Sequence, residues 1–121
     1  MSDTIKNISS DLKKFAIERD WEQFHTPKNL SMALIAETAE LVEHFQWLTP
    51  EQSKSITGEK LTDISYEMAD IFIYLLRMAE QLDIDLVSAT REKMAINEKR
   101  FPANHSDNKG SNQNHKDNKY G

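Results

Sequence analysis

Two apolar segments of the chain each carry a pair of carboxylates at helical spacing. The segment "LIAETAELVEHFQWL", residues 34–48, holds Glu37 and Glu40, and the segment "ISYEMADIFIYLLRMA", residues 64–79, holds Glu67 and Asp70. Residues three positions apart lie on one side of a helix, and here that side is otherwise apolar. Charges buried without a partner destabilise a protein by several kcal/mol. We therefore expect the four carboxylates to bind a positively charged partner.

A divalent cation is the partner that the pattern favours. Basic side chains are scarce on the helices that could face the acids, and Arg77 and Lys93 are the candidates. Carboxylate oxygens that face one another suit Mg²⁺, with Mn²⁺ as a possible substitute. The alternative is that the acids lie half-exposed at the edge of a helix bundle and pair with Lys or Arg. Two acidic pairs with the same phase on apolar helices favour the metal.

Four helices must position these acids, and their ranges follow from apolar periodicity and capping residues. The first begins near Asp3, and the others span about residues 30–47, 59–82 and 86–100. Asn29 is the expected N-cap of the second helix, and Asp83 or Asp85 that of the fourth. The polar segment "TPEQSKSITG" is interpreted as a connection. No strand pattern is present, so we expect an all-α fold, a four-helix bundle.

The composition limits the domain organisation and the function. Residues 1–102 are expected to form one domain, and the polar residues 103–121 have too few apolar side chains to fold. The absence of cysteine excludes disulfides, thiolate catalysis and zinc–thiolate sites, and it suits a cytoplasmic location. The pattern predicts no transmembrane or signal segment and hence no membrane partner. A net charge of −5 argues against binding to nucleic acid.

The acidic motif resembles that of a known family. Glu37-Thr-Ala-Glu40, 26 further residues and then Glu67-Met-Ala-Asp70 resemble the E-x-x-E…E-x-x-D signature of MazG-like nucleoside triphosphate pyrophosphohydrolases. The stretches "FAIERDWEQFHTPKNL", "FQWL", "DIFIYLL" and "KMAINEKRFP" are similar to the dCTP pyrophosphatase branch of that family. The resemblance covers residues 10–103.

The resemblance implies an all-α enzyme that hydrolyses a nucleoside triphosphate to the monophosphate and pyrophosphate with Mg²⁺. It implies a homotetramer, a dimer of dimers with sites between subunits, and a preference for dCTP and 5-substituted dCTP. Leu12 occupies a position where members of the branch can carry histidine, which leaves the base preference open. The implied metal ligands are Glu37, Glu40, Glu67 and Asp70, and the implied base-pocket residues are Trp21, His25, Trp47 and Tyr74.

Further residues are assigned by residue type and spacing. Lys93, Asn97 and Arg100 share one stripe of the fourth helix, and we expect them to bind the phosphates. The alternative is a solvated helix end, where cations are favoured anyway. Glu40 is our candidate for the base that accepts a proton from the attacking water. Phe24 is expected to be part of the core.

Two other classes of protein are consistent with parts of the pattern. One is a non-enzymatic helical oligomer whose acids bind a structural metal. The other is a carboxylate-bridged redox di-metal bundle, which requires E-x-x-H pairs. Glu40 and Asp70 stand where those histidines would be, so the redox class is disfavoured. A pyrophosphohydrolase for another base also remains open.

Overall fold

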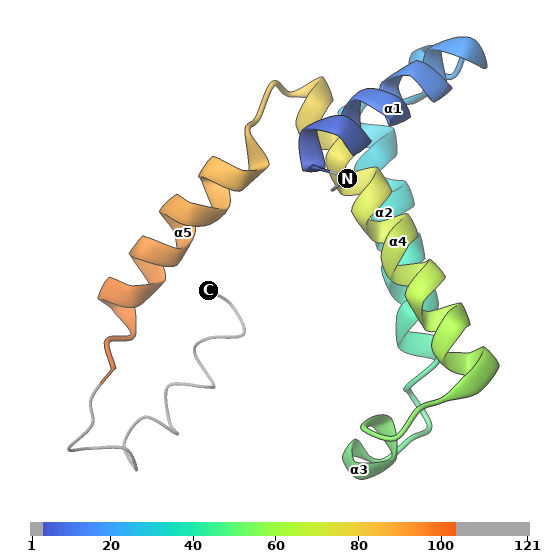
Figure 1. Ribbon diagram of the computed structural model, residues 1–121, viewed down its shortest axis with the longest axis vertical. Helices are drawn as coiled ribbons and strands as arrows, with labels where there is room; N and C mark the ends of the chain where they lie inside the picture. Colours follow the sequence, from blue (N-terminus) through green and yellow to red (C-terminus); the bar gives the residue numbers. More distant parts are fainter. Residues whose placement is uncertain (1–3, 104–121) are drawn as a thin grey trace. The chain divides into compact units, whose positions relative to one another are not determined.

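The computed structural model describes residues 4–103, and all regular structure in this range is helical (Figure 1). The prediction of an all-α fold is therefore confirmed. No helix in the described range is long and apolar enough to cross a membrane. The elements are α1 (Ile5–Glu18), the 3₁₀ helix η1 (Glu22–Phe24), α2 (Pro27–Glu43), α3 (Pro50–Ser53), α4 (Gly58–Gln81) and α5 (Leu86–Arg100).

The chain divides into two compact units, Met1–Ile84 and Asp85–Gly121. The first unit contains α1 to α4, and the second contains α5. Three of the four long helices predicted for the bundle thus belong to the first unit. The predicted boundary at residue 102 lies two residues after the end of α5, and residues 104–121 of the predicted tail lie outside the described residues.

The start of α2 differs from the prediction because Thr26, and not Asn29, is the N-cap. Thr26 Oγ1 accepts a hydrogen bond from the backbone N–H of Asn29 at 3.2 Å, and Pro27 occupies the first helical position. Proline suits that position because its ring sets a helical φ and an N–H there would have no partner. The Asn29 side chain instead donates to the Phe24 carbonyl at 3.0 Å, which ties η1 to α2.

The other helix bounds agree with the prediction except at the end of α2. That helix ends at Glu43 instead of Trp47, and the predicted connection contains α3, whose capping box joins Thr49 and Gln52. Gly58, at the start of α4, has a φ of 69°, a conformation that favours glycine. The range of α5 is as predicted, and the Asp85 carboxylate accepts from Ser88 N at 3.1 Å.

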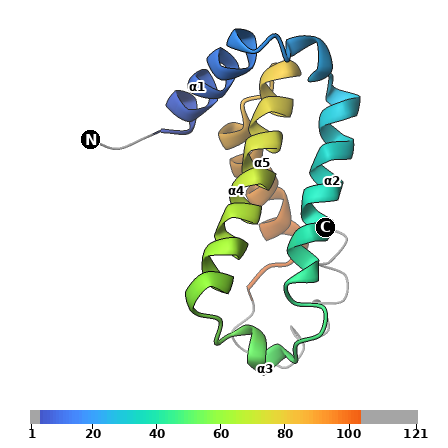
Figure 2. The ribbon, with the colours of Figure 1, turned by 90° about the vertical axis from the view of Figure 1, so that its right-hand side faces the viewer.

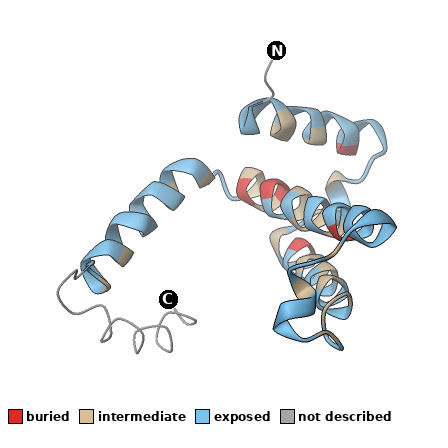
Figure 3. Cartoon of the chain, turned by 60° about the horizontal axis from the view of Figure 1, so that its bottom comes forward, coloured by how far each residue is buried: buried red, intermediate tan, exposed pale blue. Residues whose placement is uncertain are grey.

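The helices of the first unit pack around α4. Helices α2 and α4 run antiparallel side by side, α3 lies in the connection at one end of this pair, and α1 packs on α4 (Figure 1, Figure 2). The buried residues come from all three long helices (Figure 3). They are Ala16 of α1, Leu30 of α2, and Ile64, Leu76, Arg77 and Ala79 of α4.

Many large apolar side chains of the first unit are exposed in the single chain. Ile35 of α2 is 70% exposed, and Tyr66 and Met68 of α4 are 66% and 57% exposed. A domain of this size has a small core, and it gains stability when such surfaces are covered by association. The surface of α2 and α4 is therefore consistent with a subunit of an oligomer.

Candidate functional site

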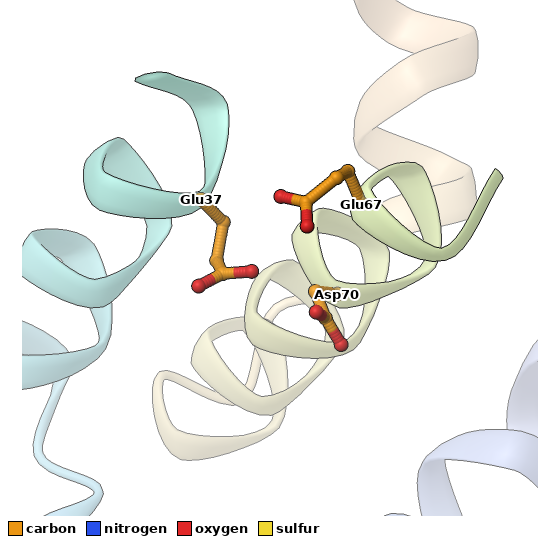
Figure 4. Close-up of side chains that lie close together, drawn as sticks. All are labelled: Glu37, Glu67 and Asp70. Carbon is orange, nitrogen blue, oxygen red and sulfur yellow. The ribbon is translucent and has the colours of Figure 1, made fainter. Parts of the chain in front are cut away.

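Three carboxylates gather between α2 and α4. Glu37 comes from α2, and Glu67 and Asp70 come from successive turns of α4 (Figure 4). Each offers an oxygen, and these three oxygens lie within 4.8 Å of one another. The i, i+3 spacing on α4 and the antiparallel packing of α2 against it bring together three of the four predicted acids. This cluster can supply an all-oxygen ligand set.

Glu40 lies close enough to the cluster to affect its electrostatics. Burial raises the pKa of Glu37 to about 7, with further contributions from a hydrogen bond with Asp70 and from the charges of Glu40, Asp70 and Glu67. Burial, followed by the charge of Glu40, also raises the pKa of Glu67. Glu40 itself is not one of the three residues whose oxygens lie within 4.8 Å. The four acids therefore repel one another when all are ionised and no cation is bound.

The cluster has the properties of a site for a hard divalent cation. Glu67 Oε2 is buried and has no hydrogen-bond partner among the described residues. A buried carboxylate oxygen without a partner destabilises the folded state unless a hydrogen-bond donor or a cation binds to it. Within residues 4–84, no Lys or Arg forms an ion pair with the four acids. Arg77, the candidate partner on α4, pairs with Glu22 and Glu80 instead. Oxygen ligands alone suit Mg²⁺ or Mn²⁺.

A cavity of about 460 Å³ adjoins the cluster through Asp70, which belongs to both. Its wall is formed by α1, α4 and the segment between α1 and α2. Three predicted base-pocket residues, Trp21, His25 and Tyr74, line it, and so does Leu12. The position at which the chain departs from the dCTP branch is thus part of the cavity wall.

The turn after α1 places Trp21 in this cavity. Trp21 N donates to the Ala16 carbonyl at 2.9 Å, and Asp20 adopts a φ of 58°, as in a Schellman motif. The Trp21 ring then packs edge-on against Phe15, with centroids 5.6 Å apart, and lies 6.1 Å from the His25 ring. Such an aromatic wall can stack against a planar ring.

Two further aromatic residues, Trp47 and Phe24, are exposed and do not line the cavity. Trp47 is 86% exposed and does not line the cavity of the single chain. Phe24 is 60% exposed, so the prediction that it belongs to the core is wrong. Phe24 ends the short η1 helix, where the chain turns into α2, and its side chain is not covered there.

The buried Arg77 was predicted only as a candidate partner for the acids, and its actual contacts were not predicted. Its side chain is 2% exposed and donates to Glu80 Oε1 at 3.0 Å, to Glu22 and to His25 Nδ1 at 3.3 Å. The i, i+3 spacing to Glu80 was visible in the sequence. The contacts with Glu22 and His25 join residues more than fifty positions apart, and no local pattern indicates them.

The three predicted phosphate-binding residues all lie on α5, in the second unit. Asn97 is partly buried, and its Oδ1 has no hydrogen-bond partner among the described residues. The Arg100 guanidinium lies 5.1 Å from the centre of the Phe101 ring. The phosphate-binding role of Lys93, Asn97 and Arg100 remains a prediction.

An all-α chain with this acidic cluster has clear relatives. It belongs to the MazG-like family, whose model matches residues 32–115. It is 40% identical over 102 residues to dCTP pyrophosphatase 1 of Homo sapiens, and 38% identical over 101 residues to that of Mus musculus. These matches cover 83% and 82% of this chain, which spans 60% and 59% of the two relatives' lengths.

A solved structure supports the same family assignment. The chain superposes on a crystal structure of a pyrophosphatase from Archaeoglobus fulgidus with a TM-score of 0.79 and 31% sequence identity. The match covers 85% of this chain and 96% of that one. The fold is therefore shared with a protein described as a pyrophosphatase.

Proposed function

We propose that the chain is a Mg²⁺-dependent nucleoside triphosphate pyrophosphohydrolase that prefers dCTP and 5-substituted dCTP. The observation that carries the proposal is the gathering of Glu37, Glu67 and Asp70 beside an aromatic cavity that shares Asp70. The names of the relatives, dCTP pyrophosphatase and pyrophosphatase, support both the reaction and the base.

In this proposal Glu37, Glu40, Glu67 and Asp70 hold the metal. The unpartnered Glu67 Oε2 and the raised pKa of Glu37 are consistent with a cluster that needs a cation. When bound, Mg²⁺ or Mn²⁺ supplies positive charge that neutralises triphosphate oxygens and stabilises the charge that develops during hydrolysis.

The reaction needs a water molecule, a base and a leaving group. The water oxygen forms a bond to phosphorus, one P–O bond of the bridge between the α and β phosphates breaks, and the monophosphate and pyrophosphate are released. Glu40 is the proposed acceptor of the proton that the water loses, since it lies beside the cluster and is exposed to solvent. No cysteine exists in the chain to act as a nucleophile.

The cavity is the proposed site for the base. Trp21 would stack on it, and His25 and Tyr74 offer polar groups at the wall. Trp47 is exposed and does not line the cavity of the single chain, and we propose that it contacts the substrate bound by a neighbouring subunit. We propose a homotetramer, in which that contact and those of Lys93, Asn97 and Arg100 with the phosphates complete the site.

A nucleotide panel tests the proposal. Pyrophosphate release is measured for the four common deoxynucleoside triphosphates and 5-methyl-dCTP, in Mg²⁺, in Mn²⁺ and in EDTA. We expect dCTP and 5-methyl-dCTP to be hydrolysed fastest, with no release in EDTA. Equal rates for all bases would contradict the base pocket, and a preference for another base would reassign it. No release from any nucleotide would favour the alternative, a helical oligomer with a structural metal.

A further inference from the structure

The hydrogen bond between Arg77 and His25 fixes the position of a proton. Arg77 Nε donates to His25 Nδ1 at 3.3 Å. A guanidinium is a donor only and does not lose its proton in proteins, so His25 Nδ1 must present a lone pair. A neutral imidazole that accepts at Nδ1 carries its proton on Nε2. This contact therefore selects one of the two neutral tautomers and disfavours the imidazolium form.

The geometry around Arg77 prevents this donor from turning away. The guanidinium is buried and also donates to Glu80 Oε1 at 3.0 Å and to Glu22. Glu80 is in turn held by Lys13, whose Nζ lies 3.3 Å from Glu80 Oε2. Three fixed partners hold the planar group in one orientation. Burial, followed by the charge of Arg77, also lowers the pKa of His25, while Glu22 opposes this shift.

The two imidazole nitrogens flank Cε1 and point in different directions, so the contact with Arg77 at Nδ1 does not use Nε2. His25 also lines the cavity with Trp21 and Tyr74. We propose that Arg77 is a positioning residue that holds His25 as the Nε2–H tautomer, so that the cavity offers an N–H donor to an acceptor atom of the base. Suitable acceptors are a carbonyl oxygen or a ring nitrogen, and a pyrimidine O2 is one example. The ligand part of this inference rests on the proposed function, whereas the tautomer does not.

The first test reads the tautomer directly, in the absence of any nucleotide. Imidazole ¹⁵N shifts are recorded by NMR for the parent, Arg77→Met, Arg77→Lys and Glu80→Gln, and the His25 signals are assigned with His25→Ala. We expect Nε2–H alone in the parent and in Glu80→Gln, which keeps the Arg77–His25 contact. Both Arg77 variants should show a tautomer mixture and a higher His25 pKa. A parent with Nδ1–H, or Arg77 variants that keep pure Nε2–H, would overturn the proposal.

The second test asks whether Arg77 acts on substrate through His25. kcat/KM for dCTP is measured for His25→Ala, Arg77→Met and the double variant. Loss of one hydrogen bond predicts a decrease of about tenfold for His25→Ala. The decrease for Arg77→Met should be smaller, because part of the His25 population keeps the Nε2–H tautomer. The double variant should lose no more than His25→Ala does, because the two residues act as one unit. A double variant whose loss of kcat/KM equals the product of the two single losses would overturn the positioning role of Arg77. A parent that hydrolyses no nucleotide would contradict the proposed function, and the ligand part with it, while the NMR test still decides the tautomer.

Discussion

Glu37 of α2 and Asp70 of α4 lie beside each other at the helix interface, with their ligand oxygens within 4.8 Å. Two carboxylates so placed cannot both ionise without cost unless a proton or a cation lies between them. The pKa of Glu37 is accordingly raised to about 7, by burial first and then by a hydrogen bond with Asp70. Protonation of Glu37 therefore relieves the repulsion among the acids in the absence of metal, and we expect Mg²⁺ to take that role when it is bound.

The first prediction concerns how the free energy of unfolding of the metal-free protein depends on pH. The pKa of Glu37 is raised from 4.5 to about 7 in the folded chain, so the folded state binds the proton more tightly than the unfolded state. The contribution of Glu37 to stability is then fully present below pH 4.5 and is lost as the pH rises toward 7. Urea unfolding in EDTA at several pH values measures it.

The control for that prediction is Glu37→Gln, which cannot ionise. Its free energy of unfolding should decrease less than that of the parent between pH 4.5 and pH 7, the ordinary and the raised pKa of Glu37. Equal slopes for the two proteins would show that Glu37 ionises normally and that the acids do not form the cluster described.

The second prediction concerns the packing that holds the cluster. Leu30 of α2 is 2% exposed, so Leu30→Ala should reduce the free energy of unfolding by about 2–5 kcal/mol through lost contacts and a cavity. The matched control is Leu61→Ala on α4, where the side chain is 51% exposed and the cost should be much smaller. Chemical denaturation measures both, and similar losses would contradict the placement of Leu30 in the core.

The third prediction concerns Trp21 in the wall of the cavity. Trp21→Leu removes a stacking surface from the cavity, and kcat/KM for dCTP should fall about fivefold or more. Its melting temperature should change little, because Trp21 is 43% exposed. A decrease in melting temperature with unchanged kcat/KM would instead assign Trp21 to the structure alone.

The fourth prediction concerns assembly. The exposed Ile35, Tyr66 and Met68 predict that the chain associates, and we expect a tetramer, or at least a dimer, by light scattering at micromolar concentration. If Trp47 completes a neighbour's site, oligomers formed from Trp47→Leu and Asp70→Asn chains together should be more active than the mean of the two separate variants. A monomeric parent would contradict both expectations.

Local periodicity was sufficient to predict the ranges of α4 and α5, and it places Glu67 and Asp70 on one side of α4. The spacing of Glu67 and Asp70 determines that they share one side of α4, whatever the tertiary structure. The start of α2 was predicted wrongly because Asn29 and Thr26 are both good caps, and the proline after Thr26 decides between them. The prediction for Phe24 failed because residue type alone does not show which aromatic side chains are covered.

The cavity could be predicted only through a resemblance, since its wall joins residues distant in sequence. Periodicity indicates that Leu12 and Phe15 face inward but not that they face Trp21 and Tyr74. Arg77 was the larger omission. A lone arginine on an apolar helix gives no indication of its partners, and its contact with His25 appears only when η1 is placed against α4.

The central claim, that the acids form a metal site, is tested most directly by melting the parent and Asp70→Asn in EDTA and in millimolar Mg²⁺. Asp63→Asn, an exposed acid of the same helix, is the matched control. In EDTA the Asp70 variant should be as stable as the parent or more stable by up to about 1 kcal/mol, because one repulsive charge has been removed. Mg²⁺ should raise the melting temperature of the parent and of the control more than that of the variant. An Asp70→Asn protein clearly less stable than the parent in EDTA would contradict the metal site and assign Asp70 to a structural ion pair.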